Sequence, residues 1–181
     1  MQIRRATMED HREIQVLMEL TFGPREGANE LLRKWLTTSD FSAFVAVENR
    51  IIGFSLARLE IVDAVSGFFF EHKVGSFQTL LILPEFRRKQ VGENLSQAQL
   101  KWMIDQGCTA ASGNSWNHGG EGTSSHLFIK GGFEKLGEVQ DFYLEGSRKT
   151  DHVCPTCEGT CHCSSTLYGK ILKSPPLKHQ S

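Results

Sequence analysis

Four cysteines near the end of the chain carry the strongest chemical signal in the sequence. Cys154 and Cys157 form a C-x-x-C pair, and Cys161 and Cys163 follow three residues later as C-x-C. Four thiolates at this spacing suit one tetrahedral Zn²⁺ with bonds of about 2.3 Å, which is a structural site closed to substrate. We therefore predict a zinc site formed by these four residues.

Three alternatives stay open for this cysteine-rich segment. His152 or His162 could replace one thiolate, because an imidazole nitrogen is also a good zinc ligand. The cysteines could hold an iron–sulfur cluster, although nothing nearby in the sequence suggests electron transfer. The segment could also be a reduced loop without metal, since the short C-x-C arm strains the geometry around a single ion.

A second chemical pattern lies in the middle of the chain. An apolar strand is predicted at residues 79–83, where it stops at a proline, and a helix is predicted to begin at Val91. Arg87, Arg88 and Lys89 come just before that helix. The free N–H groups and the positive dipole end of a helix start bind anions. The pattern predicts a phosphate-binding turn, with a solvated basic turn as the simpler alternative.

Bulk composition narrows the class of protein. A length of 181 residues, with 39% hydrophobic and 23% charged residues, suits one soluble domain with a full core. The net charge of −1 gives no overall attraction to nucleic acid or anionic membrane. The start of the chain lacks the apolar core of a signal peptide, and no apolar run approaches the about 20 residues that span a bilayer. We expect a cytoplasmic monomer or homodimer without nucleic-acid or membrane partners.

The elements that would position these groups alternate between helices and strands. Hairpins mix with crossover connections, which predicts the α+β class and a mixed sheet of about seven strands flanked by about four helices. A single domain is expected over residues 1–173, with a cysteine-rich insertion at 147–164 between the last two strands and a flexible tail at 174–181. The expected strands are residues 2–6, 44–47, 51–59, 79–83, 108–112, 133–144 and 167–172, and the expected helices are 7–22, 28–36, 91–106 and 123–130. We expect Thr7 and Asp10 to cap the first helix, the second helix to bury Leu31, and residues 112–122 to form a glycine-rich loop.

Two segments resemble the GCN5-related N-acetyltransferase (GNAT) superfamily. Residues 87–92, RRKQVG after a strand, resemble its acetyl-CoA motif R/Q-x-x-G-x-G/A, and residues 128–133, FIKGGF, resemble its later Y-x-K-x-G-F segment. The element order also matches over almost the whole chain. The resemblance implies a GNAT-like, mostly antiparallel twisted sheet. It also implies transfer of acetyl from acetyl-CoA to an amine of a small molecule or peptide, by direct attack in a ternary complex.

The resemblance further implies which residues bind the coenzyme. The strand end should pair with the pantetheine arm, the helix start should hold the pyrophosphate, and the basic side chains should reach the 3′-phosphate. Gln90 stands where the motif has its first glycine, and a left-handed backbone there costs about 1–2 kcal/mol more for glutamine. The implied residues are Leu81, Ile82, Leu83, Arg87, Arg88, Lys89, Gln90, Val91, Gly92 and Glu93.

Catalytic groups are harder to assign. The tyrosine with which many relatives protonate the leaving thiolate corresponds to Phe128, which cannot donate a proton. We expect Ser124 or Ser125, one helical turn earlier, to carry or relay that proton, and Glu71 to act as the base. Hydroxyls bonded to their own helix and a solvated carboxylate are the simpler alternatives. The absent donor also leaves an alternative function, a non-catalytic acyl-CoA-binding or metal-sensing module.

The resemblance also suggests a role for the predicted zinc site. In the superfamily, the loop between the last two strands lies near the acceptor side of the cleft. The metal would then hold this loop in place and shape the acceptor pocket without taking part in the chemistry.

Overall fold

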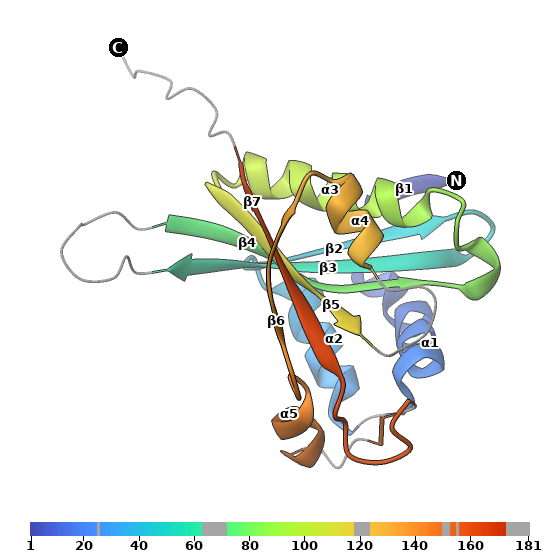
Figure 1. Ribbon diagram of the computed structural model, residues 1–181. Coiled ribbons are helices and arrows are strands. Elements are labelled where there is room, and N and C mark those ends of the chain that lie inside the picture. Colours follow the sequence, from blue (N-terminus) through green and yellow to red (C-terminus); the bar gives the residue numbers. More distant parts are fainter. Residues whose placement is uncertain (25, 63–71, 118–123, 150–152, 155, 173–181) are drawn as a thin grey trace.

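One seven-stranded sheet organises the molecule (Figure 1). The computed structural model describes residues 1–24, 26–62, 72–117, 124–149, 153–154 and 156–172. The strand order is β1-β2-β3-β4-β5-β7-β6, and every neighbouring pair is antiparallel except β4 with β5. The predicted α+β class and mostly antiparallel sheet are confirmed.

The elements have the following bounds. The strands are β1 Gln2–Arg5, β2 Phe41–Val47, β3 Ile51–Val62, β4 His72–Ile82, β5 Ala110–Asn117, β6 Glu134–Val139 and β7 Ser164–Ile171. The α-helices of the described residues are α1 His11–Phe22, α2 Ala28–Thr37, α3 Val91–Asp105, α4 Ser125–Lys130 and α5 Leu144–Lys149, and two 3₁₀ turns are Met8–Asp10 and Pro84–Phe86.

The entry into α1 is fixed by side-chain hydrogen bonds. The backbone N–H of Thr7 donates to the Asp10 carboxylate at 2.8 Å, which is the capping arrangement expected from the sequence. Arg4 of β1 donates two further hydrogen bonds of 2.7 Å to that carboxylate. The Arg4 guanidinium, acting against burial, holds the pKa of Asp10 below its usual value. These bonds tie the first helix to the first strand.

Helices cover both faces of the central strands. Figure 1 shows α3 on one face of β2–β4, with α4 next to α3, and α1 and α2 on the other face. The buried side of α3 includes Gln99, whose amide donates to the carbonyls of Ser42 at 2.9 Å and Ser55 at 3.1 Å. These bonds anchor the middle of α3 to β2 and β3. No helix of the described residues is long and apolar enough to cross a membrane.

Several sequence-based boundaries were wrong. The strand expected at 108–112 is β5, which continues to Asn117, through residues that we expected to be in a glycine-rich loop, because it pairs with β7 along eight residues. The strand expected at 133–144 ends at Val139, and α5 follows a turn at Asp141, where φ is 52°. The described residues therefore contain five α-helices, where about four were expected. Leu31 was expected inside and is 45% exposed, since Leu32 takes the buried position on α2.

Other boundaries differ less. The first helix, α2, α3 and α4 lie within two residues of the expected bounds at almost every end. The strand expected at 79–83 is the second half of β4, which begins at His72. Residues 173–181, which include the expected tail, lie outside the described residues. The cysteine-rich segment does lie between the last two strands, β6 and β7.

Candidate functional site

Strands β4 and β5 pair over a short distance and then separate. Their four paired positions end at Phe77 and Gly113, although β4 continues to Ile82 and β5 to Asn117. The register of β4 against β3 shifts at the same height, leaving Gln78 as an extra residue in a β-bulge. A bulge bends its strand and increases the local twist. The opening beyond Phe77 and Gly113, visible in Figure 1, is called the fork below.

The fork leaves one edge of β4 without a strand partner. Strand β3 pairs with β4 as far as Ile82, but on the other side no described strand pairs with β4 after Phe77. Unpaired backbone N–H and C=O groups of a strand edge bind extended chains that carry amide groups. Residues from Gln78 to Ile82 therefore offer a docking edge for an extended ligand. Leu81 and Leu83 keep their side chains in the core, and the Leu83 backbone is already bonded, its N–H to the Ile52 carbonyl at 3.0 Å and its C=O to the Phe86 N–H at 2.9 Å.

The start of α3 lies just after this edge. Arg88 and Gln90 both adopt the left-handed conformation, with φ of 59° and 62°, and no side chain caps the helix. The first N–H groups of an uncapped helix have no intrahelical partner, and left-handed residues turn backbone N–H groups into a concave anion site. The left-handed geometry considered for Gln90 is therefore present. Arg87, Arg88 and Lys89 are all exposed beside it.

Close packing holds the helix start against β4. A Cβ added to Gly92 would lie 3.0 Å from the Cδ1 atoms of both Ile82 and Leu127. Glu93 would oppose an anion at the helix start, but it forms a 2.8 Å ion pair with Lys130 of α4. The predicted coenzyme residues are thus brought together around one exposed, uncapped helix start. Their contact with a coenzyme remains a prediction.

Phe128 closes the fork on the side of α3 and α4. The side chain is buried, and its ring stacks on Tyr168 with centroids 4.9 Å apart and planes 12° apart. The ring of Phe77 meets its edge at 5.8 Å. A Cβ added to Gly113 would lie only 2.5 Å from Phe128 Cζ. An apolar ring therefore fills the place where a proton donor was expected, and it does so by packing on the last paired residue of β5.

The predicted catalytic serines lie at the start of α4. Ser124 precedes the helix and Ser125 is its first residue, and both are half-buried. The Ser124 carbonyl accepts the N–H groups of Leu127 at 3.0 Å and Phe128 at 3.3 Å, while its hydroxyl makes no capping bond. Glu71 lies outside the described residues. The roles suggested for these three side chains remain predictions.

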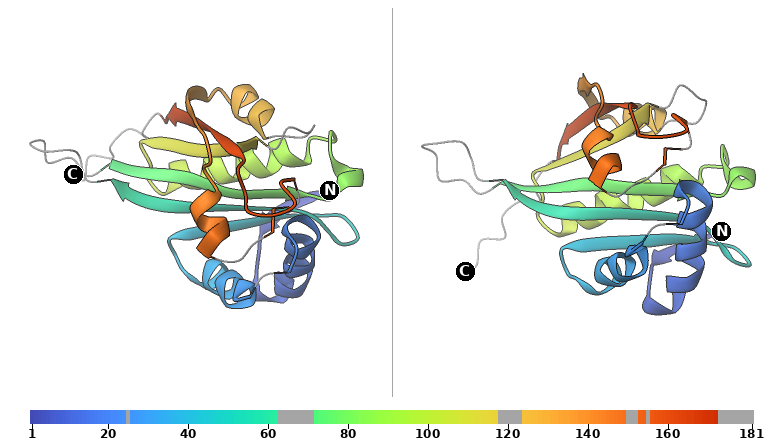
Figure 2. Two further views of the ribbon diagram at one scale, coloured as in Figure 1. Left: turned by 60° about the horizontal axis from the view of Figure 1, so that its bottom comes forward. Right: turned by 90° about the horizontal axis from the view of Figure 1, so that it is seen from below.

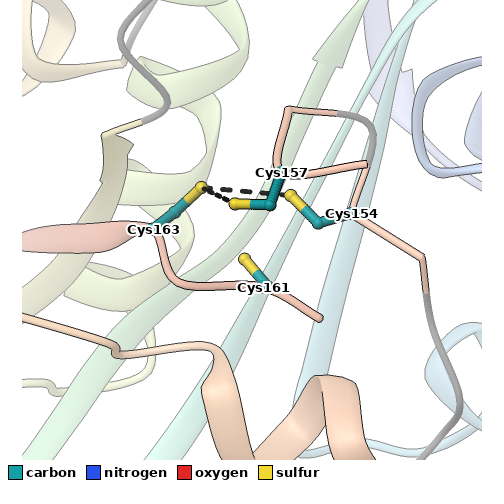
Figure 3. Close-up of side chains that lie close together, drawn as sticks. All are labelled: Cys154, Cys157, Cys161 and Cys163. Atoms are coloured by element: carbon teal, nitrogen blue, oxygen red, sulfur yellow. Dashed lines mark hydrogen bonds between the residues drawn. The ribbon is translucent and has the colours of Figure 1, made fainter. Parts of the chain in front are cut away.

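The four cysteines of the C-terminal segment converge (Figure 3). Their sulfur atoms all lie within 4.8 Å of one another, with Cys163 at 3.9 Å from Cys154 and 3.6 Å from Cys157. Four ligands at about 2.3 Å from one Zn²⁺ form a tetrahedron with edges of about 3.8 Å. The spacing of the sulfurs therefore fits a single tetrahedral metal ion. Cys154, Cys161 and Cys163 are buried and Cys157 is exposed, so such an ion would be shielded from solvent on the side of the three buried cysteines.

Backbone hydrogen bonds shape the loop that carries the cysteines. Cys154 N–H donates to the Gly159 carbonyl at 2.7 Å, and Glu158 N–H donates to the Cys154 carbonyl at 2.8 Å. Glu158 takes a left-handed conformation, with φ of 54°, to make this turn. Cys161 N–H donates to the Ser147 hydroxyl at 3.0 Å, which attaches the loop to α5. The loop is thus folded by its own backbone as well as by the convergence of its cysteines.

The thiols have strongly separated pKa values. Burial raises the pKa of Cys154, but the backbone N–H groups of Cys157 and Thr156 outweigh burial and bring this pKa down to about 7. Burial raises the pKa of Cys163 to about 12, although the indole N–H of Trp116 acts to lower it. Together with burial, the neighbouring Cys154 raises the pKa values of both Cys161 and Cys163. A divalent cation bound among the sulfurs would counteract these increases, because it stabilises the thiolate form of every ligand.

Histidines do not take the place of the thiols among the described residues. The ring of His162 is exposed, and its Nδ1 lies 3.0 Å from an Asp141 carboxylate oxygen. Its backbone N–H instead donates to Cys157 Sγ at 3.4 Å. His152, the other alternative ligand, lies outside the described residues. The donor set that the structure brings together is the four cysteines.

The cysteine cluster packs against β5 near the fork. Trp116 and Tyr143 contact the three buried cysteines, and their rings meet edge to face with centroids 6.4 Å apart. The Tyr143 hydroxyl oxygen accepts a 3.0 Å hydrogen bond from the amide of Asn114, the first β5 residue past the paired region. Burial raises the pKa of Tyr143, so its hydroxyl stays protonated at neutral pH.

Sequence reasoning missed most of this link. Tyr143 was expected on a strand, which is wrong, because it lies in the turn between β6 and α5. Asn114 and Trp116 were expected in a glycine-rich loop. The alternation of small residues with Asn114 and Trp116 was the available signal for a strand with one tightly packed face.

In all three views the segment that leads into β7 lies near α1 (Figures 1 and 2).

Comparison with solved structures finds the same fold in several acetyltransferases. Arabidopsis thaliana NAA60 with a bisubstrate analogue has a TM-score of 0.76 and 15% identity, covering 96% of this chain and 99% of that chain. The ribosomal-protein-S18-alanine N-acetyltransferase of Escherichia coli has a TM-score of 0.69 and 10% identity, covering 98% and 97%. The aminoglycoside 6'-N-acetyltransferase of Enterococcus faecium has a TM-score of 0.68 and 13% identity, covering 97% and 99%.

Comparison of sequences gives the family directly. No curated protein matches the chain. The model of the acetyltransferase (GNAT) family matches residues 7–119, which is more than half of the 181 residues and includes the fork and the start of α3. The chain therefore belongs to the acetyltransferase (GNAT) family.

Proposed function

We propose that this acetyl-CoA-dependent N-acetyltransferase binds the coenzyme and an acceptor amine together at the fork, where the amine attacks the thioester directly. The observation that carries the proposal is the coincidence of three features: the bulge at Gln78, the free edge of β4 beyond it, and the uncapped start of α3. Together they suit a ligand with an extended, amide-containing arm that ends in phosphates. Acetyl-CoA has that shape.

The coenzyme would lie along β4. Its pantetheine amides would pair with the unpaired backbone between Gln78 and Ile82, and its pyrophosphate would accept N–H groups from Gln90 to Glu93. Arg87, Arg88 and Lys89 would supply positive charge to the phosphates. This placement brings the thioester to the bulge. It is supported by the geometry above and by a structure of similar fold, Arabidopsis thaliana NAA60, in complex with acetyl-CoA.

The reaction needs few side chains at this place. The amine nitrogen forms a bond to the thioester carbon, the carbon–sulfur bond breaks, and the proton that the amine loses passes to the leaving thiolate. Backbone N–H groups at the bulge would stabilise the oxyanion that develops on the carbonyl oxygen. The thiolate of a thiol with a pKa of about 8.5 is a good leaving group, so it departs without a strong acid beside it. The loss of a donor at Phe128 is therefore compatible with catalysis, and Ser124 or Ser125 would relay the proton.

The four cysteines would hold one structural Zn²⁺. The sulfur spacing and the burial of Cys154, Cys161 and Cys163 support a closed site, in which the ion has no open position for substrate. The bound ion would supply only structural stability. It would fasten the segment between α5 and β7 to Trp116 of β5, on the face of the sheet that carries α1 and α2. We propose that the acceptor amine approaches from this face.

An acetyl-transfer assay against a panel of amines tests the function. The panel contains peptides with free N-terminal Ala, Ser or Met, together with spermidine and kanamycin, and acetylated products are detected by mass spectrometry. Thiol-reactive dyes are unsuitable because they would attack the cysteine cluster. We expect acetylation of at least one amine. Tight acetyl-CoA binding without any product would instead support the alternative, a non-catalytic acyl-CoA-binding or metal-sensing module.

A further inference from the structure

Asn114 stands at the fork on the side away from Phe128. It is the first residue of β5 after the last pair with β4, so it lies opposite the bulge at Gln78. Gly113 faces Phe128, and side chains alternate along a strand, so Asn114 faces the side of α1 and α2. Its hydrogen bond to Tyr143 confirms that side, because Tyr143 packs on the cysteine cluster.

Hydrogen bonds fix the orientation of the Asn114 side-chain amide, that is, which of its two end atoms is the nitrogen. Its Nδ2 donates to the Tyr143 hydroxyl oxygen at 3.0 Å and to Ser165 Oγ at 3.1 Å. Ser165 Oγ donates its own hydrogen to the Ser115 carbonyl at 3.1 Å, so towards Asn114 it can only accept. The nitrogen must therefore face Ser165. Both amide hydrogens are then used, and among the described residues Asn114 Oδ1 has no hydrogen-bond partner.

We propose that Asn114 Oδ1 accepts an N–H of the acceptor amine and thereby aims the nitrogen lone pair at the thioester carbon. Asn114 would touch the substrate, whereas Tyr143 and Ser165 are positioning residues that act by holding its amide. This inference rests on the proposed function and adds to it the residue that places the nucleophile.

The chemistry favours a neutral oxygen at this position. An amine attacks only when it is unprotonated, because the ammonium form has no free lone pair. A carboxylate next to the amine would stabilise the ammonium form and raise its pKa. An amide oxygen accepts the same hydrogen bond but carries no charge, so it does not raise the pKa of the amine. An acceptor held in this way must keep at least one hydrogen on its nitrogen, which selects primary and secondary amines over tertiary ones.

The arrangement also connects the cysteine cluster to the nucleophile. The Tyr143 ring is wedged against Trp116 and the buried cysteines, and the hydroxyl at its far end holds Asn114. The position of the hydroxyl thus depends on the folding of the cysteine loop. A metal bound there would influence the acceptor through Tyr143 without touching it.

Steady-state kinetics of Asn114→Ala test the inference, with the panel amine that shows the highest turnover as the acceptor. Losing one hydrogen bond to the amine should lower kcat/KM for the acceptor about tenfold, while KM for acetyl-CoA stays within about twofold. Asn117→Ala is the matched control. Asn117 also lies on β5 and donates to two β7 hydroxyls, those of Ser164 and Thr166, but it falls on the alternate face. Its acceptor kinetics should equal those of wild type.

A double-mutant cycle separates positioning from general stability. Tyr143→Phe keeps the ring and its packing but removes the hydroxyl, and it should lower acceptor kcat/KM about threefold. If Tyr143 acts through Asn114, the double variant should be no slower than Asn114→Ala alone. A role of Tyr143 in general stability would instead make the two effects multiply, which would overturn its assignment as a positioning residue.

Two further results would overturn the proposal. Equal acceptor kinetics for Asn114→Ala and Asn117→Ala would show that the Asn114 oxygen does not hold the amine. An increase in KM for acetyl-CoA alone would place Asn114 at the coenzyme instead. If wild type binds acetyl-CoA but acetylates no panel amine, the proposed function fails and this inference fails with it. That outcome is recognised before any variant is made.

Discussion

Replacing Cys163 by serine should remove the metal and lower the melting temperature. Cys163 Sγ lies 3.9 Å from that of Cys154 and 3.6 Å from that of Cys157, so it occupies one corner of the sulfur tetrahedron. Serine is a much weaker zinc ligand than a thiolate at neutral pH. We expect the zinc content to fall from about one ion per chain to less than about 0.1.

The size of the stability loss follows from ligand linkage. A site with free zinc at about 1,000 times its dissociation constant stabilises the folded state by about 4 kcal/mol. Unfolding of a 181-residue chain near 60 °C carries an entropy of about 0.4 kcal/mol per kelvin. The Cys163→Ser variant should therefore melt about 10 °C below wild type. The loss should be reproduced when a strong chelator is added to the wild-type protein.

The assay combines two measurements on reduced protein. Inductively coupled plasma mass spectrometry gives the number of zinc ions per chain. Calorimetry gives the melting temperature in zinc-containing buffer and after chelation. Cys108→Ser is the matched control, since Cys108 is equally buried but lies in the core cluster of α3 and β5, away from the other four. Its zinc content should not change. Zinc retained at one ion per chain in Cys163→Ser, or a chelator that leaves the wild-type melting temperature unchanged, would refute the reasoning.

Three further predictions concern the framework around the fork. Asp10→Asn should lower the free energy of unfolding at pH 7 by about 2 kcal/mol, because it breaks the charged bonds to Arg4. Because the folded pKa of Asp10 is depressed, the stability that its carboxylate contributes is present above its ordinary pKa and is lost as pH falls through the folded pKa. Urea titrations should therefore show the free energies of unfolding of the two proteins converging in acid. A difference that stays constant with pH would contradict this. Gly113→Ala should cost about 1–3 kcal/mol, since its Cβ would clash with Phe128, and an unchanged urea midpoint would be the contrary result. Gln90→Gly should add about 0.5 kcal/mol by relieving the left-handed backbone, with acetyl-CoA affinity by calorimetry within about twofold of wild type; a loss of stability would show that the glutamine side chain matters there.

The parts of the fold that local rules govern were predictable from the sequence. The capping of α1 through Thr7 and Asp10 depends on residues three apart, and the start of α3 at Val91 follows a proline-terminated strand. The positive φ that was considered for Gln90 is present because the turn into α3 requires it. In the same way, the convergence of the four cysteines follows from their spacing along one short loop.

The parts that failed depend on contacts between distant residues. β5 looks like a loop because Gly113 and its neighbours are small, and only the ring of Phe128, 15 residues later in the chain, explains that small size. The Asn114–Tyr143 bond joins residues 29 apart and depends on a turn that the strand pattern did not indicate. The bulge at Gln78 is set by pairing with β3, and it leaves no mark in the sequence of β4 alone.

The central claim is that acetyl-CoA occupies the fork between β4 and β5. A crystal structure of the complex tests it most directly. The account predicts the pantetheine arm along β4 from Gln78 to Ile82, with the pyrophosphate within hydrogen-bond distance of the backbone N–H groups at the start of α3. A coenzyme bound elsewhere, with the fork filled by side chains or by the chain itself, would contradict it.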